Sequence, residues 1–208
     1  MLNWLGSIME AGLRFFYGII PNWSVAIILL TIAIRVVLLP LTVSQMRSSQ
    51  IMAKLQPKIK EIQEKYKKDP TRLNLETQNL WRENKVNPFS GCLLTLIQFP
   101  FLIAFFQMLR GFDFGGAGFL WVKNLAQPDP YVLPILAAVT SYWQMKVATP
   151  SQDPSTRWMN FMFPVLIGWM SRSFAAGLTL YWVVSNLFTV AQQFVMPAPV
   201  RKTEGAKS

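Results

Sequence analysis

The sequence predicts an all-α integral membrane protein: a bundle of five spanning helices, a cytoplasmic helical hairpin, and an N-terminal amphipathic helix at the membrane interface. Of the 208 residues, 52% are hydrophobic and only 14% are charged, whereas a soluble domain carries about 25% charged residues. The apolar residues stand in long runs, which is typical of helices that cross a hydrocarbon layer. One polar stretch between the first two runs has helical periodicity, which predicts the hairpin.

Residues 1–20 predict an amphipathic helix that lies along the membrane surface rather than crossing it. Glu10 and Arg14 are four residues apart and are expected to pair on one face of this helix. Apolar residues recur at helical spacing on another face. They are Leu2, Leu5, Met9, Leu13, Phe16 and Ile20. Pro21 and Asn22 are expected to end the helix.

The first span is expected at residues 23–43, and its only ionisable side chain is Arg35. Because a helix rises about 1.5 Å per residue, Arg35 lies roughly 18 Å from Trp23 and inside the hydrocarbon layer. An arginine there costs about 2.5–3.5 kcal/mol on insertion scales, and it cannot lose its proton. None of the five expected spans contains Asp or Glu. Arg35 therefore needs a water-filled cavity, or else its long side chain must reach towards the interface.

Residues 44–86 predict two amphipathic helices that form an antiparallel hairpin outside the membrane. Asp69 followed by Pro70 is typical of an N-cap and the first position of a helix. Pro57 is expected to kink the helix before it. The apolar stripes of the two helices comprise Ile51, Leu55, Ile62 and Tyr66, and then Leu73, Leu80 and Trp81.

Four further spans are expected in the rest of the chain. They are residues 89–109, 131–147, 158–174 and 176–195, with an extracytoplasmic loop at 110–130, a cytoplasmic loop at 148–157 and a cytoplasmic tail at 196–208. The last three spans have about 17–20 apolar positions, near the lower limit for crossing roughly 30 Å of hydrocarbon. Short spans favour local thinning of the bilayer.

The distribution of basic residues predicts the orientation. The chain has 20 Lys and Arg and a formal net charge of +10. If the hairpin is cytoplasmic, 15 of these basic residues lie on that side, in the hairpin, the second loop and the tail. The opposite side has Arg14, Arg110, Lys123 and Arg172. This asymmetry predicts an N-terminus outside and a C-terminus in the cytoplasm.

Polar side chains in three spans indicate where Arg35 finds water. Thr31 precedes it by one turn on the same face, and Gln98 lies in the middle of the second span. The fifth span carries Tyr181, Trp182, Ser185 and Asn186. Each of these alone is more often a hydrogen-bonding contact between helices. Together with an unpaired arginine, they predict a hydrated groove that attracts an acidic or hydrophilic polypeptide segment.

Composition excludes several classes of function. The chain has no histidine, and its single cysteine, Cys92, stands in an apolar context, so histidine triads, haem ligation and a metal site are not expected. With no acidic residue in the spans, an acid–base set for an enzyme is lacking, and no cofactor is expected. A small anion transporter or channel stays an alternative, because it would use the same arginine; the missing internal repeat and the long charged hairpin argue against it.

Several ordered segments resemble the YidC membrane-protein insertase family, whose relatives serve mitochondria and chloroplasts. The segments are 31–35 with 39–42, 55–60, 87–88 with 91–92 and 98–100, and 180–182 with 185–186. The resemblance covers the chain from about residue 20 to 195 and is to the compact form, which lacks the large extracytoplasmic domain of many Gram-negative members. It implies a five-helix core, a cytoplasmic hairpin, and a groove arginine that receives hydrophilic parts of substrates.

The same resemblance implies roles for individual residues. Arg35 corresponds to the groove arginine, while Thr31, Gln98 and Trp182 correspond to groove positions, with Tyr181 beside them. It implies an insertase and chaperone of the bacterial plasma membrane, with nascent membrane proteins as clients and no DNA partner. The Sec translocase and the ribosome are further candidate partners. A ribosome contact would use the hairpin lysines, for which a solvated, topology-setting face is the alternative: Lys54, Lys58, Lys65, Lys67 and Lys68.

Overall fold

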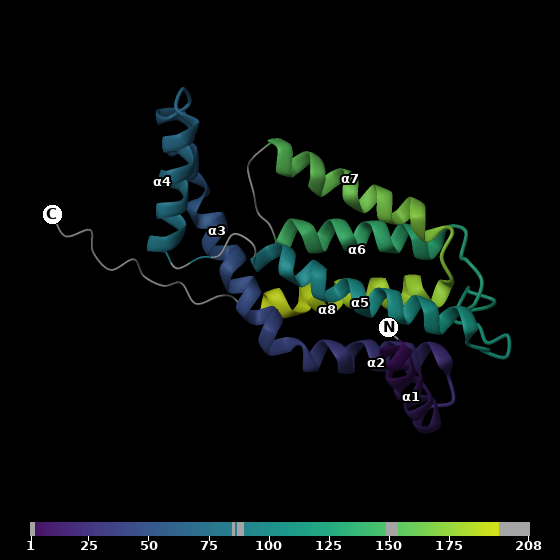
Figure 1. The fold of residues 1–208 in the computed structure, drawn as a ribbon. Helices are drawn as coiled ribbons and strands as arrows, with labels where there is room; N and C mark the ends of the chain where they lie inside the picture. The colour runs from purple at the N-terminus through teal and green to yellow at the C-terminus, as the bar shows by residue number, and fades with distance from the viewer. Residues whose placement is uncertain (1–2, 85, 87–89, 149–153, 196–208) are drawn as a thin grey trace.

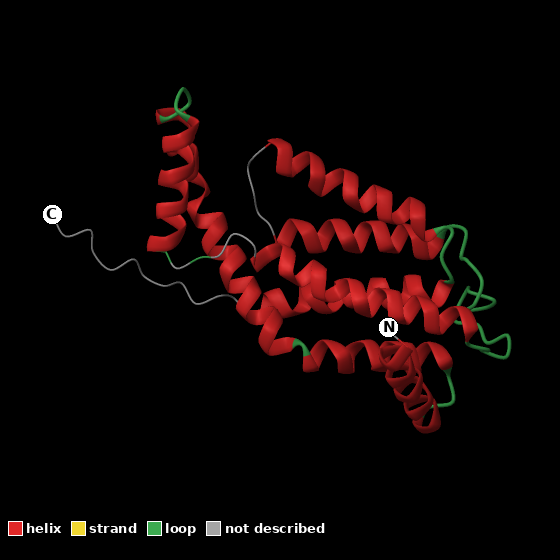
Figure 2. Ribbon diagram, in the orientation of Figure 1, coloured by secondary structure: helices red, strands yellow, loops and turns green. Residues whose placement is uncertain are grey.

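The computed structural model describes residues 3–84, 86, 90–148 and 154–195. Within these residues the chain forms helices and no strand (Figures 1 and 2). The helices are α1 Asn3–Ile19, α2 Trp23–Val37, α3 Leu39–Lys65, α4 Pro70–Glu83, α5 Ser90–Gly111, α6 Val132–Ala148, α7 Pro154–Ser171 and α8 Ala176–Val195. The all-α class is confirmed, while the number of spanning helices stays a prediction.

Helix α1 packs against α2 and α5 through one apolar stripe and crosses them at the edge of the bundle (Figure 1). Leu5, Met9 and Leu13 form this stripe at a spacing of four residues and are buried. The expected ion pair between Glu10 and Arg14 is present, at 2.9 Å, on the exposed side. The helix also exposes large apolar side chains, namely Trp4, Ile8, Phe15 and Ile19. Helix α1 therefore has an exposed apolar face that is suited to contact with an apolar environment.

Helix α2 is shorter than the first span expected from the sequence. The side chain of Asn22 caps its start by accepting from the backbone N–H groups of Ser24 and Val25. The helix ends at Val37, and α3 begins after Leu38 in a direction that differs by 65°. Pro40 explains the break, because proline has no N–H to donate and its ring crowds the carbonyl four residues earlier. The expected continuous span over 23–43 is thus two helices.

Helices α3 and α4 form the expected hairpin, which projects away from the rest of the molecule (Figure 1). The side chain of Asp69 accepts from the N–H of Arg72, and Pro70 is the first residue of α4, as the sequence predicts. Helix α3 continues through Pro57 as one helix. The hairpin has a small apolar core of its own, made of Leu55, Ile59, Leu80 and Val86.

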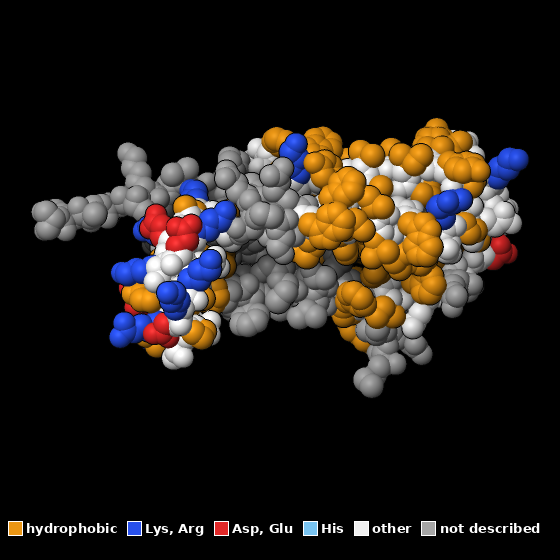
Figure 3. All heavy atoms as spheres, turned by 90° about the horizontal axis from the view of Figure 1, so that it is seen from above, with side chains coloured by type: hydrophobic (Ala, Val, Ile, Leu, Met, Phe, Trp, Pro, Cys, Tyr) orange, Lys and Arg blue, Asp and Glu red, His pale blue; other side chains and the backbone are white. Residues whose placement is uncertain are grey.

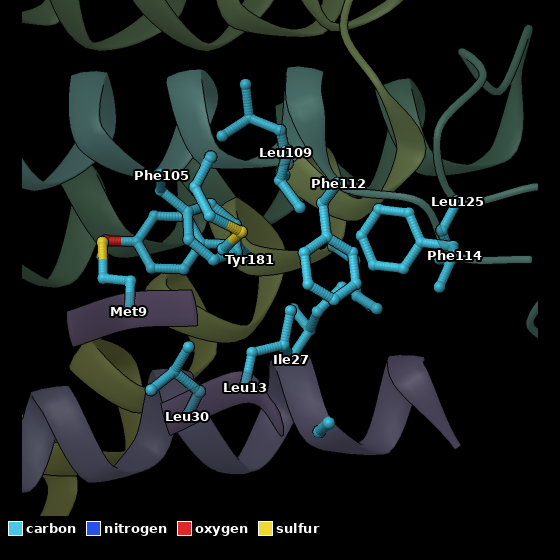
Figure 4. Close-up of a cluster of buried hydrophobic side chains, with 14 of the residues drawn as sticks. Met9, Leu13, Ile27, Leu30, Phe105, Leu109, Phe112, Phe114, Leu125 and Tyr181 are labelled. Carbon is cyan, nitrogen blue, oxygen red and sulfur yellow. The ribbon is translucent and has the colours of Figure 1, made fainter. Parts of the chain in front are cut away.

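The remaining helices form a bundle in which α6 packs against both α7 and α8, and α8 packs against α2. One apolar core joins α1, α2, α5, α8 and the loop after α5 (Figure 4). Tyr181 of α8 lies in this core, and its ring centroid is 4.7 Å from that of Phe105 on α5. This core holds α2 and α8 side by side, and residues of both helices belong to the candidate site.

The loop between α5 and α6 is tied to the start of α8. The N–H groups of Ala176 and Gly177 donate to the carbonyls of Gln127 and Leu125, at 2.8 and 3.0 Å. The loop turns tightly at Leu120, whose φ of 53° lies in the left-handed region that leucine rarely adopts. These bonds close the end of the bundle opposite the hairpin.

Polar and apolar side chains divide the surface into two parts. Charged residues gather on the hairpin, whereas apolar side chains cover much of the visible bundle (Figure 3). The most apolar surface belongs to α7, where Trp158, Met159, Phe161, Trp169 and their neighbours are exposed. By length and apolar content, no described helix alone would cross a bilayer, although the bent pair of α2 and α3 passes the same test jointly.

Candidate functional site

A cavity of about 530 Å³ lies among α2, α5, α6, α7 and α8. Its lining comprises Arg35, Phe99, Leu102, Ile103, Phe106, Gln144, Phe163, Leu166, Ile167, Met170, Ser171, Phe174, Leu178, Thr179, Tyr181, Trp182, Ser185 and Asn186. A space of this size holds many water molecules or part of a polypeptide segment, and it lies within the usual range of ligand pockets.

The cavity has two chemically different walls. Helices α2, α6 and α8 supply almost all of the polar lining, including Arg35, Gln144, Ser185 and Asn186. Of the α5 side chains that the structure describes, Phe99, Leu102, Ile103 and Phe106 line the cavity and all are apolar, and α7 contributes apolar side chains and Ser171. The hydroxyl of Ser171 donates to the carbonyl of Ile167 in its own helix, so its hydrogen-bonding capacity is partly used. The cavity can therefore hold a polar group on one side and an apolar group on the other.

Among the described lining residues Arg35 is the one that carries a charge, and it stands one turn before the break at Leu38. Its side chain is buried, at 8% exposure. The recorded ion pairs of the described residues are Glu10–Arg14 and Asp69–Arg72, and neither includes Arg35. Its place in the last turn of α2 is favourable for a cation, since the carbonyl ends of a helix carry partial negative charge. The guanidinium is thus positioned to accept an external anionic partner.

Hydrogen bonds between α6 and α8 hold the polar wall in place. The indole Nε1 of Trp182 donates to Oγ of Ser141 at 3.0 Å. The amide of Asn186 lies 2.9 Å from the same hydroxyl. With its oxygen towards Trp182 and Ser141, its nitrogen donates to Oε1 of Gln144 at 2.9 Å, which satisfies both ends of the amide. This network fixes the side chains that face the cavity.

Within the described residues, two hydroxyl groups of the polar wall have no hydrogen-bonding partner. They are Oγ1 of Thr179 and Oγ of Ser185, and both residues line the cavity and are almost fully buried. A buried hydroxyl without a partner is costly, so such groups normally bind water or a ligand. The polar wall therefore has unused hydrogen-bonding capacity beside the charge of Arg35.

The structure brings together five of the groove residues expected from the sequence: Arg35, Tyr181, Trp182, Ser185 and Asn186 all line the cavity. Thr31 does not line it. The Thr31 hydroxyl donates to the carbonyl of Ile27 at 2.7 Å, and the residue is buried on α2. The backbone of Gln98 lies in α5, but its side chain is outside the described part of the structure.

Sequence reasoning missed Gln144, Thr179 and the apolar wall. An amide in an otherwise apolar helix is a signal that could have identified Gln144. The apolar side chains of α5 and α7 carry no such signal, because facing a cavity and facing lipid require the same residue types. Only the packed arrangement of the helices shows that these side chains line the cavity.

The five hairpin lysines stand apart from the cavity and are exposed on α3 and the turn to α4. They are Lys54, Lys58, Lys65, Lys67 and Lys68. Within the described ranges, no group of three or more His, Cys, Asp or Glu side chains is arranged to hold a metal ion.

Comparison with known proteins gives consistent matches over most of the chain. Residues 15–203 match the family described as 60Kd inner membrane protein. The membrane protein insertase YidC of Caldanaerobacter subterraneus subsp. tengcongensis is 40% identical over 204 residues, which are 97% of this chain and 96% of that relative. The YidC of Fusobacterium nucleatum is 42% identical over 177 residues, covering 84% and 86% of the two chains.

Other relatives are longer than this chain. The YidC of Endomicrobium trichonymphae is 38% identical over 92% of this chain, but the match spans only 39% of that protein. A crystal structure of an active YidC insertase, with its first transmembrane domain resolved, superposes with a TM-score of 0.74 at 32% identity. That match covers 92% of this chain and 46% of the solved chain.

Proposed function

Because the chain belongs to the YidC insertase family, that of the 60Kd inner membrane protein, we propose that it inserts nascent membrane proteins into the bilayer and assists their folding there. Family membership places it in a bacterial membrane. The cavity receives the hydrophilic segment of a client, and the adjoining apolar segment passes into the lipid. No chemical step is required, and the protein acts as an insertase and chaperone rather than as an enzyme.

The distribution of side chains supports embedding in the bilayer. Large apolar residues are exposed on α6, α7 and α8, including Tyr142, Trp143, Trp169 and Phe194. Many polar residues of the bundle are instead buried, among them Thr31, Arg35, Thr140 and Asn186. A water-soluble protein has the opposite preference, whereas lipid contact explains an apolar exterior around a polar interior. We place the N-terminus outside and the tail in the cytoplasm, as the basic residues indicate.

The observation that carries the proposal is the unpaired Arg35 in the cavity. A client carboxylate about 4 Å from the guanidinium gains about 4 kcal/mol at an effective dielectric constant of 20. The net gain after loss of hydration is about 1.5–3 kcal/mol, as for hydrogen bonds to charged groups. The unpartnered hydroxyls of Thr179 and Ser185 add hydrogen bonds to the same segment.

The apolar wall of the cavity receives the other part of the client. Helices α5 and α7 both line the cavity, and α7 packs mainly against α6 rather than against α5. An apolar client segment can therefore lie between these two helices while the hydrophilic part stays beside Arg35. The exposed hairpin lysines are available for a ribosome or for anionic headgroups, and cooperation with the Sec translocase is a further part of this proposal.

The test measures insertion into proteoliposomes of a small single-spanning client with two aspartates in its translocated segment, beside the same client with serines in their place. Arg35→Ala is expected to reduce insertion of the acidic client by about ten- to a hundredfold, since a charged hydrogen bond is lost. Arg35→Lys keeps part of the activity because it keeps the charge. Arg172→Ala, at an exposed arginine, serves as the control. Equal insertion of the acidic client by wild type and Arg35→Ala would refute the role of the charge.

An anion channel would use the same arginine, but it gives no role to the apolar wall of α5 and α7. The same liposomes distinguish the two functions. Chloride flux that is lost in Arg35→Ala, without insertion of either client, would replace the insertase proposal with the channel.

A further inference from the structure

Buried polar side chains continue along α8 beyond the cavity, towards the hairpin. Ser185 lines the cavity, and Thr189 and Gln192 follow it on the same face of the helix, four and seven residues later. All three residues are buried. Seven residues of helix span about 10 Å. The polar wall therefore extends past the cavity as a seam, which we define as Ser185, Thr189 and Gln192 of α8 with Thr42 and Gln45 of α3.

The seam joins α8 to the start of α3, immediately after the bend. Nε2 of Gln192 donates to Oγ1 of Thr42 at 2.8 Å, and Figure 1 shows the end of α8 beside this part of α3. Gln45 lies three residues after Thr42 on the same face of α3. The seam thus leads from the Arg35 cavity to the base of the hairpin.

Gln45 has an unusual environment for an amide. Its side chain is buried, at 6% exposure, and neither its Nε2 nor its Oε1 has a hydrogen-bonding partner. Almost all buried polar groups in proteins are paired, so an amide with both ends free calls for a ligand or for ordered water. Gln192, on the facing helix α8, is hydrogen-bonded to Thr42. Of the described seam residues, Gln45 and the hydroxyl of Ser185 keep free hydrogen-bonding capacity, and Gln45 alone offers both a donor and an acceptor group of an amide.

A side-chain amide carries a donor and an acceptor side by side, as a peptide group does. It can bind the N–H and C=O of an extended backbone at once, whatever side chains that backbone carries. This differs from Arg35, which selects for negative charge. An insertase handles many sequences, so a site that recognises the main chain complements a site that recognises charge.

We propose that Gln45 is a binding site for the peptide backbone of the client's hydrophilic segment, at the hairpin end of the seam. The inference rests on the proposed function and deepens it. The client segment passes along the seam, with its main chain paired to the Gln45 amide, before its acidic side chains reach Arg35. The Gln192–Thr42 hydrogen bond holds α3 and α8 at the spacing that this pairing needs.

The first test is the stability of the protein without a client. Gln45→Leu removes an amide that has no partner, so the melting temperature is expected to stay the same or rise. Gln192→Leu removes a hydrogen bond that exists, so its melting temperature is expected to fall by a few degrees. A fall of the same size in Gln45→Leu would show that the Gln45 amide is already satisfied in the protein, and would overturn the proposal.

The second test uses the acidic and neutral clients described above. Gln45→Leu is expected to reduce insertion of both clients by the same factor, about tenfold, as loss of two neutral hydrogen bonds predicts. Gln50→Leu, at a half-buried glutamine of the same helix, is the matched control and leaves insertion unchanged. The contrast with Arg35→Ala, which affects the acidic client selectively, separates backbone recognition from charge recognition.

Each other outcome counts against the inference. Unchanged insertion in Gln45→Leu would mean that the seam holds only water. Loss confined to the acidic client would assign Gln45 to the charge site and not to the backbone. If the wild-type protein inserts neither client, the proposed function itself fails, and the backbone site falls with it.

Discussion

Gly168 on α7 is expected to set the distance between α7 and α6, and replacing it with alanine tests this directly. A Cβ atom at Gly168 would lie 2.8 Å from Cβ of Ala138 and 3.1 Å from the carbonyl oxygen of Pro134, both on α6. Small residues at helix interfaces in membranes let backbones approach closely. Since α7 packs mainly against α6, an added methyl group is expected to push α7 outward as a whole.

The size of the effect follows from these distances. Ordinary van der Waals contact begins at 3.4 Å, so the helices must separate by roughly 0.6 Å or more. Overpacking of this kind costs about 1–3 kcal/mol. For a chain of this size each kcal/mol lowers the melting temperature by about 2–4 °C. We expect Gly168→Ala to melt about 4–8 °C below wild type for a cost of about 2 kcal/mol.

The assay is thermal unfolding in detergent, with Gly18→Ala as the matched control. A Cβ at Gly18 meets nothing within 4 Å, so alanine there is neutral or stabilises α1. Adding Ala138→Gly to Gly168→Ala removes the closest contact and should restore part of the loss, giving a coupling in the double-mutant cycle. The reasoning fails if Gly168→Ala is as stable as Gly18→Ala, or if the two substitutions on α6 and α7 are additive.

Three further predictions concern stability outside the α6–α7 contact. Asp129→Ala removes the carboxylate that accepts from the N–H of Leu133 in the first turn of α6, and should lower stability by about 1 kcal/mol in thermal melts. Leu80→Ala opens the small hairpin core at a cost of about 2 kcal/mol or more, seen as faster tryptic cleavage of the hairpin while the bundle stays intact. Trp182→Phe removes the hydrogen bond to Ser141 and should cost about 0.5–1.5 kcal/mol, whereas an unchanged melt would show that this bond contributes nothing.

Local signals in the sequence predicted those parts of the structure that depend on neighbouring residues. The Asp69–Pro70 cap and the Glu10–Arg14 pair are both present because each depends only on residues within one turn. The absence of acidic residues from the apolar runs identified Arg35 as unpaired before any helix was placed. Its location in a polar-walled cavity then followed from the packing of α2 against α8.

Other features required the packed structure. Pro40 was a signal for the break at Leu38. However, proline is also tolerated in the first turn of a helix, so the sequence alone does not show to which helix Pro40 belongs. Pro57 lies inside α3 and does not end it, while the kink expected at this proline stays a prediction. The free amide of Gln45 could not be predicted, because a glutamine near the end of an apolar run is usually solvated.

The division of the cavity into two walls has a consequence for how the protein can be altered. Among the described lining residues, the charge comes from α2, most of the polar groups come from α6 and α8, and most of the apolar surface comes from α5 and α7. Under the proposed function, substitutions on α5 or α7 are therefore expected to change which membrane-spanning segments are accepted, while the handling of hydrophilic segments stays the same. The selection of apolar client segments and the handling of hydrophilic ones can therefore vary independently within one small fold.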